Sequence, residues 1–224
     1  MQKKKLFQII AIILLASMLA MVAASQELEV CKETIVCGDA IPPMITALYP
    51  ANGSYVNGLV GVVADAVDDG NNAERIAKIK FYIDGNLRLT DFSRPFSYTW
   101  NTNLETEGQH LVKARAYDLA GNWAERTNTV TVDRTPPIVN IINPLNGQTV
   151  SGTIPVNADA NDNFVVSSVG FYIDGTIKFI DVTPPYSYSW NTAAYLNGNH
   201  SITARAVDKA YNAQTHTIIV NVSN

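Results

Sequence analysis

Seven aspartates in this sequence are placed where they could act as metal ligands. Each lies at or near the end of a segment in which apolar and polar residues alternate. They are Asp65, Asp68, Asp118, Asp133, Asp159, Asp162 and Asp208. Oxygen ligands that come from separate loops suit Ca²⁺, so the sequence predicts calcium sites here, one of them at the junction between its two halves. The alternative is that these aspartates cap turns by accepting hydrogen bonds from nearby backbone amides.

The sequence contains no arrangement of residues typical of a catalytic site. Of its three histidines, His110 and His200 occupy equivalent positions in an internal repeat, which favours a structural role over general-base chemistry, and the third is His216. There is no G-x-S-x-G, no H-E-x-x-H and no phosphate-binding glycine loop. We therefore expect no enzyme activity.

Three aromatic residues differ between the two halves and are the candidates for ligand binding. They are Trp123, Tyr195 and Tyr211. Aromatic rings in loops can stack on sugars or anchor a protein partner, but single exposed aromatics are also common and carry no function. The hypothesis therefore depends on whether the three rings gather on one face.

These candidates lie in a tandem duplication. FYIDG occurs at 81–85 and again at 171–175, and WNT occurs at 100–102 and again at 190–192. The first copy carries four extra residues near Asp69–Glu74. The chain therefore divides into two units, 41–133 and 134–224, each large enough to bury its own core.

Apolar residues within each unit alternate with a period of two, as at Val60, Val62, Ala64 and Ala66. This alternation, broken by Gly, Pro, Asn and Asp, predicts half-buried strands. In the first unit these are 44–49, 58–67, 76–84, 86–92, 96–101, 109–117 and 127–133. Roughly seven short strands predict an all-β antiparallel sandwich of immunoglobulin type in each unit. The Asp-Gly of FYIDG predicts a type I′ hairpin turn.

Both units resemble the bacterial immunoglobulin-like domains found as repeats in secreted hydrolases and surface proteins. The shared pattern is P-P, N-G, A-D-A, F-Y-I-D-G, P-[FY]-S-Y-[ST]-W-N-T, G-x-H and A-R-A-x-D, and it covers residues 41–224. The resemblance implies a noncatalytic module that serves as a spacer, a stabiliser or a binder at the cell surface. It specifies no ligand.

The first residues are typical of export. Lys3–Lys5 precede an apolar run from Leu6 to Ala24, which predicts a secretory signal peptide at 1–24 or, alternatively, an uncleaved membrane anchor. The segment 25–40 is a linker that holds both cysteines. Cys31 and Cys37 are expected to form a disulfide, with free thiols or a metal as the alternatives. The mature chain is expected outside the cell or at its surface.

These observations predict an exported, noncatalytic tandem module with an adhesion or spacer role at the cell surface. The alternative is a carbohydrate-binding accessory module of a secreted hydrolytic system. The net charge of −4 argues against a nucleic-acid partner. A surface protein or a polysaccharide is the expected partner, membrane contact is expected only through an uncleaved N-terminal segment, and no cofactor other than Ca²⁺ is expected.

Overall fold

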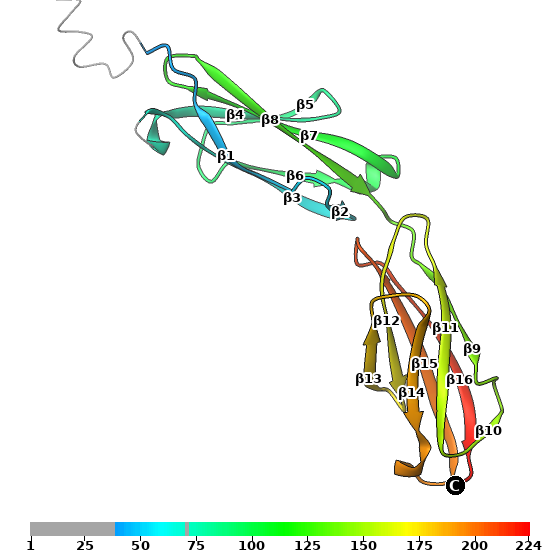
Figure 1. Cartoon of the computed structure of the whole chain (residues 1–224). Helices are drawn as coiled ribbons and strands as arrows, with labels where there is room; N and C mark the ends of the chain where they lie inside the picture. The colour runs from blue at the N-terminus through cyan, green and yellow to red at the C-terminus, as the bar shows by residue number, and fades with distance from the viewer. Residues whose placement is uncertain (1–38, 70–71) are drawn as a thin grey trace, which may run out of the picture.

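The computed structural model describes residues 39–69 and 72–224, which form two β-sandwich domains (Figure 1). The predicted signal peptide and the predicted Cys31–Cys37 disulfide lie outside the described residues. Among those residues, no helix is long and apolar enough to cross a membrane.

Each domain packs a three-stranded sheet against a five-stranded sheet. In domain 1 the strand orders are β1-β3-β6 and β2-β8-β7-β4-β5, and in domain 2 they are β14-β11-β9 and β10-β16-β15-β12-β13. The strands of domain 1 are β1 (Met44–Tyr49), β2 (Tyr55–Val56), β3 (Leu59–Val67), β4 (Ile76–Ile83), β5 (Asn86–Asp91), β6 (Ser97–Asn101), β7 (Gly108–Asp118) and β8 (Trp123–Val132). Those of domain 2 are β9 (Ile138–Asn143), β10 (Thr149–Val150), β11 (Thr153–Asn161), β12 (Val166–Ile173), β13 (Thr176–Asp181), β14 (Tyr186–Asn191), β15 (Gly198–Asp208) and β16 (Ala213–Val222).

The cores lie between the two sheets of each domain, where the alternating apolar residues meet. Trp100 and Phe81 are buried in domain 1, and Trp190 and Phe171 are buried in domain 2. Burying one such side chain contributes about 1.5–3 kcal/mol. The predicted all-β pair of sandwiches is therefore confirmed.

The sequence missed two details of the strands. Each domain has an additional two-residue strand, β2 or β10, that pairs in parallel with the last strand, so the sheets are not purely antiparallel. A strand of two residues is too short to show alternation. In addition, β8 begins at Trp123 rather than at residue 127. The prediction missed the first residues because none of those from Trp123 to Thr127 is buried, so they show no alternation that lines the core.

The repeated FYIDG forms the predicted hairpin turn. Asp84 and Gly85 have φ angles of 50° and 79°, and Asp174 and Gly175 have 50° and 75°, as a type I′ turn requires. Asp84 also accepts a hydrogen bond from the Leu111 amide at 2.8 Å. The aspartate therefore ties the β4–β5 turn to β7 as well as forming the turn.

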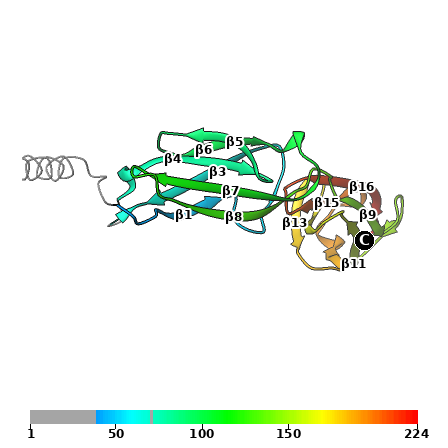
Figure 2. The same cartoon turned by 90° about the horizontal axis from the view of Figure 1, so that it is seen from above.

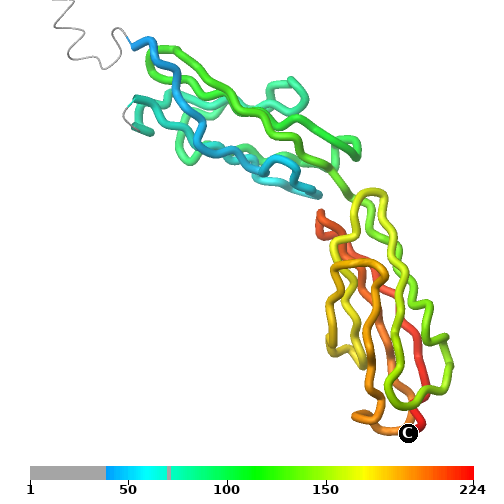
Figure 3. Tube along the Cα trace, in the orientation of Figure 1, coloured from blue at the N-terminus to red at the C-terminus, as the bar shows by residue number. Residues whose placement is uncertain are grey.

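The two domains lie end to end with a bend between them, as Figures 1 and 3 show and as the view from above confirms (Figure 2). Asn57 after β2 donates to the carbonyl of Ala210 at 2.9 Å and to Oδ1 of Asn212 at 2.7 Å. The ring of Tyr55 meets the ring of Phe164 edge to face, with centroids 6.1 Å apart. Side chains of domain 1 thus contact two turns of domain 2.

Candidate cation site at the domain joint

Three aspartates meet at this joint. Asp133 follows β8 of domain 1, Asp162 follows β11, and Asp208 ends β15. One carboxylate oxygen from each lies within 4.8 Å of the others. We name these three residues the joint cluster. All three belong to the set that the sequence predicted as metal ligands.

Hydrogen bonds fix the carboxylates of the joint cluster but leave oxygens without partners. Asp208 accepts from the backbone amide and the side chain of Asn212 at 2.8 and 2.7 Å. Asp133 accepts from the Thr135 amide through Oδ1, and Asp162 accepts from the Phe164 amide through Oδ2. The remaining oxygens, Asp133 Oδ2 and Asp162 Oδ1, are buried without a hydrogen-bond partner. Burying such atoms is costly unless a partner is supplied.

The electrostatics of the joint cluster also favour a cation. Asp133 is fully buried, and this burial, together with the nearby charges of Asp162 and Asp208, raises the pKa of Asp133 to about 6. Among the described residues, no ion pair reaches any member of the joint cluster. A divalent cation would neutralise these charges and would lower the pKa of Asp133.

Domain 1 contains an equivalent cluster, formed by Asp39, Asp68 and Asp118, again with one oxygen from each within 4.8 Å of the others. We name these three residues the terminal cluster. Here a protein cation is present, because Arg75 places its guanidinium nitrogens 3.6 Å from Asp39 and 3.7 Å from Asp68. Arg75 ends the short 3-10 helix Ala73–Arg75, beside the insertion that domain 2 lacks.

Asp39 was not among the predicted ligands, although the sequence holds a signal for it. Asp39 precedes Pro42-Pro43 by the same spacing with which Asp133 precedes Pro136-Pro137. The local bonds also match, because Asn122 donates to the carbonyl of Asp39 at 3.0 Å, as Asn212 donates to that of Asp133 at 2.9 Å. Aligning the two Pro-Pro pairs would have identified Asp39.

Asp65 and Asp159 lie outside both clusters. In the alternation of β3, Ala64, Ala66 and Asp68 are buried and Asp65 is exposed, so Asp65 faces the opposite way from the terminal cluster. Its carboxylate pairs with Arg94 at 3.1 Å. Asp159 is the exposed equivalent on β11. The prediction overlooked that residues one position out of phase on a strand point to opposite faces.

The three candidate aromatics are not gathered on one face. Tyr195 and Tyr211 lie at opposite ends of β15, and Trp123 opens β8 in the other domain. Trp123 is stacked by the Arg115 guanidinium at 4.3 Å. Tyr195 packs edge to face on Trp190 with centroids 5.3 Å apart, so it serves the core of domain 2. Only Tyr211, 85% exposed in the β15–β16 turn, projects into solvent without such a contact.

The model of the bacterial Ig domain matches the chain twice, at residues 43–114 and 137–204, which is more than half of its length. The chain belongs to the bacterial Ig domain family. Domains of this kind are typically noncatalytic. None of the curated proteins matches the chain.

Solved structures share the architecture. The fibronectin(III)-like modules of Clostridium thermocellum CbhA superpose with a TM-score of 0.61 and 22% identity, over 81% of this chain and 94% of that one. At this identity the likeness shows the fold alone. SGBP-B of the mixed-linkage glucan utilization locus of Bacteroides ovatus matches with a TM-score of 0.33 and 11% identity, over 82% of this chain and 48% of that one. A score this low supports no functional argument.

Proposed function

We propose that this tandem of bacterial Ig domains is an exported, noncatalytic spacer at the cell surface, whose joint is held at a fixed angle by Ca²⁺. The observation that carries the proposal is the joint cluster, because its ligands come from both sides of the connection between the domains. Asp133 ends domain 1, whereas Asp162 and Asp208 belong to turns of domain 2. An ion bound to all three would resist bending at this point.

The chemistry of the joint cluster favours Ca²⁺ over other cations. Its charged ligands are carboxylates, and the described residues place no His or Cys among them. Zinc sites usually include nitrogen or sulfur ligands, and Mg²⁺ demands a tighter octahedral geometry than Ca²⁺ does. Water and backbone carbonyls would complete the coordination of Ca²⁺.

The contacts around the ion site support a stiff connection. Glu107 of domain 1 accepts from the backbone amide of Arg134 at 2.9 Å and from the side chain of Asn163 at 3.3 Å. Together with the bonds of Asn57, these hold the linker and two turns of domain 2 against the end of domain 1. Such a unit suits the separation of an attached surface protein from its point of attachment.

The carbohydrate-binding alternative has less support. It needs a platform of aromatic rings, and Trp123, Tyr195 and Tyr211 come from separate places. A glycan-array screen of the full chain separates the two functions, since a spacer binds no glycan. Saturable binding to one glycan class would overturn the spacer assignment.

The calcium part is tested by calorimetric unfolding and small-angle X-ray scattering of the full chain in EGTA and in Ca²⁺. At about 100 times its dissociation constant, a bound ligand stabilises the folded state by about 2.7 kcal/mol. We expect Ca²⁺ to raise the melting temperature and to narrow the distribution of interdomain angles. Because protons compete for Asp133, whose pKa is about 6, calcium affinity should fall as the pH drops through this value.

The informative variant is Asp162→Asn, with Asp159→Asn as its matched control outside the cluster. In EGTA, Asp162→Asn should be at least as stable as the wild type, because it removes one of three repelling charges. In Ca²⁺ it should lose most of the stabilisation, while Asp159→Asn keeps it. Equal calcium responses in both variants, or no response in the wild type, would remove the ion from the proposal.

A further inference from the structure

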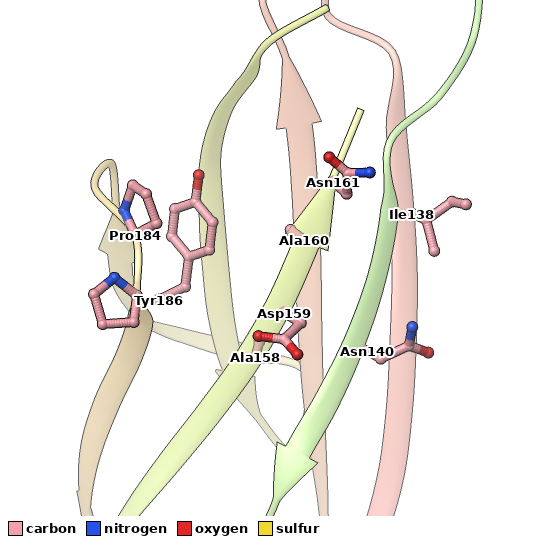
Figure 4. A pocket seen from close by; sticks show the side chains of 9 residues that line it. Ile138, Asn140, Ala158, Asp159, Ala160, Asn161, Pro184 and Tyr186 are labelled. Atoms are coloured by element: carbon pink, nitrogen blue, oxygen red, sulfur yellow. The ribbon is translucent and has the colours of Figure 1, made fainter. Parts of the chain in front are cut away.

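Domain 2 carries a surface pocket of about 310 Å³ beside its three-stranded sheet (Figure 4). Strands β9 and β11 and the segment before β14 form it. Its lining residues are Ile138, Asn140, Ala158, Asp159, Ala160, Asn161, Pro184, Pro185 and Tyr186. In Figure 4, Pro184 and Tyr186 stand on one side of β11, with Ile138 and Asn140 on the other.

In domain 1 an arginine of the chain itself occupies the equivalent place. Arg94 donates to the Asp65 carboxylate at 3.1 Å and to the carbonyl of Ala66 at 3.3 Å. Its guanidinium lies 5.7 Å from the centroid of the Phe96 ring. A third bond, at 3.3 Å, reaches the carbonyl of Ala73 in the short 3-10 helix. Domain 1 thus shows how this position binds a guanidinium group.

The repeat aligns these groups with the lining of the pocket. The TPPYSYSW of domain 2 corresponds to SRPFSYTW, so Pro184 replaces Arg94 and Tyr186 replaces Phe96. The strand pairing agrees with this alignment. Ala158 lies opposite Tyr186 in domain 2, and in domain 1 the equivalent Ala64 donates its amide to the carbonyl of Phe96. The ADA motif aligns Asp159 with Asp65. Domain 2 therefore has the same carboxylate, backbone carbonyl and aromatic ring, but it has no arginine at this position.

The exposure of the two strands agrees with the absence of an arginine from domain 2. Ala66, beside Arg94, is fully buried, whereas Ala160 is partly exposed. Asp159 has no ion-pair partner among the described residues, while Asp65 is paired. Domain 2 also lacks the Ala73 carbonyl, but the amide side chains of Asn140 and Asn161 line its pocket and can accept hydrogen bonds in its place.

We propose that this pocket binds the guanidinium group of an arginine side chain that a partner protein supplies. A guanidinium offers five N–H donors in a plane, which match a carboxylate together with carbonyl acceptors, and its face stacks on an aromatic ring. Lysine presents a compact ammonium group that cannot satisfy this flat arrangement. The pocket therefore selects arginine over lysine.

The test is a titration of the ¹⁵N-labelled full chain with Nα-acetyl-argininamide, followed by NMR, with Nα-acetyl-lysinamide as the competing probe. We expect saturable shifts of the amides of Ala160 and Asn161, with a dissociation constant on the order of millimolar, typical of a single side chain. The lysine probe should bind at least tenfold more weakly. Equal affinity for both probes, or no saturable shift at these amides, would overturn the proposal.

Two variants make the test specific. Pro184→Arg restores the Arg-Pro sequence of domain 1, so its own side chain should fill the pocket and weaken probe binding at least tenfold. Asp159→Asn removes the carboxylate without adding a side chain, so it tests the proposal independently of whether Pro184→Arg folds. Unchanged probe binding in Asp159→Asn would contradict the proposal. This variant should keep its response to Ca²⁺, so failure here is distinguishable from failure of the joint cluster.

Discussion

The two domains share a fold but differ in where their positive charge comes from. The terminal cluster of domain 1 is paired with Arg75, and the place beside Asp65 is filled by Arg94. In domain 2 the joint cluster has no ion-pair partner among the described residues, and Pro184 stands where domain 1 has Arg94. Domain 1 therefore has a positive charge of its own at two positions where domain 2 has none among the described residues, although both carboxylate oxygens of Asp68 lack a hydrogen-bond partner.

This difference shows where a duplicated domain acquires its binding properties. The carboxylates, the strands that hold them and the asparagines that fix them are the same in both copies, because the fold needs them. Domain 2 has the same fold without either arginine, so its acceptors stay available to an ion or a partner. In domain 2, moreover, the end that carries the aspartates faces domain 1.

The difference between the two domains is tested most directly by removing Arg75 from the terminal cluster of domain 1. In Arg75→Ala, Asp39 and Asp68 of the terminal cluster lose their ion-pair partner. This cluster then resembles the joint cluster, which has no ion-pair partner among the described residues. Breaking a buried ion pair costs about 3–5 kcal/mol; because the Arg75 side chain is 19% exposed, we expect a loss of about 2 kcal/mol in EGTA. Ca²⁺ should then restore part of this stability, which calorimetric unfolding would detect.

The control for this variant is Arg126→Ala, which removes an exposed arginine that bonds only the carbonyl of Thr46 among the described residues. It should change stability by less than about 0.5 kcal/mol and should create no response to Ca²⁺ in domain 1. If Arg75→Ala is no less stable than this control, the positive charge of Arg75 does not balance the terminal cluster.

The sequence was sufficient for the fold and for five of the six clustered aspartates, all except Asp39. Alternation and Asp-Gly turns are local signals, so the strands and the hairpins could be predicted residue by residue. Clustering of the aspartates required the knowledge that β3 and β7 end together, which the immunoglobulin topology supplied for Asp68 and Asp118. The role of Arg75 could not be predicted, because its contacts with Asp39 depend on how a short 3-10 helix folds over the end of the sandwich.

A second, smaller contrast concerns the buried tryptophans. Trp100 donates its indole N–H to Glu105 at 3.2 Å, whereas the equivalent of Glu105 is Tyr195, and the Trp190 indole nitrogen is buried without a hydrogen-bond partner. Both Trp→Phe variants lose packing, but only Trp100→Phe also loses a hydrogen bond. Since one such bond contributes about 1 kcal/mol, Trp100→Phe should cost about 1 kcal/mol more than Trp190→Phe.

Denaturant unfolding of the two variants measures this contrast. Each substitution should lower the stability of its own domain and leave the other domain unchanged. The Tyr195→Glu variant supplies the missing acceptor in domain 2. In this background, the stability lost on Trp190→Phe should increase toward the stability lost on Trp100→Phe. Equal costs in the two original variants would show that the indole hydrogen bond contributes no net stability.

The smallest expected effect is one that the two domains should share, and it concerns pH. His110 lies 2.6 Å from Asp84 through Nδ1 and 2.9 Å from the Thr106 carbonyl through Nε2. His200 makes the same contacts with Asp174 and the Leu196 carbonyl, at 2.6 and 2.8 Å. A carboxylate and a carbonyl only accept hydrogen bonds, so both ring nitrogens must donate, and the imidazolium form fits each site.

The pKa of both histidines is accordingly raised in the folded state. For His110, burial acts most strongly and lowers the pKa, but the bonds to Thr106 and Asp84 together outweigh it; for His200 the bond to Asp174 is the leading cause. A histidine whose pKa is raised in the folded state contributes its full stabilisation below the ordinary pKa of 6.5. This stabilisation is lost as the pH rises through the raised pKa. Stability should therefore decline above pH 6.5 in both domains, by less than about 1 kcal/mol per partly exposed pair. His110→Gln and His200→Gln should each abolish the decline in one domain only, and an unaltered pH profile in either variant would show that its histidine is not the titrating group.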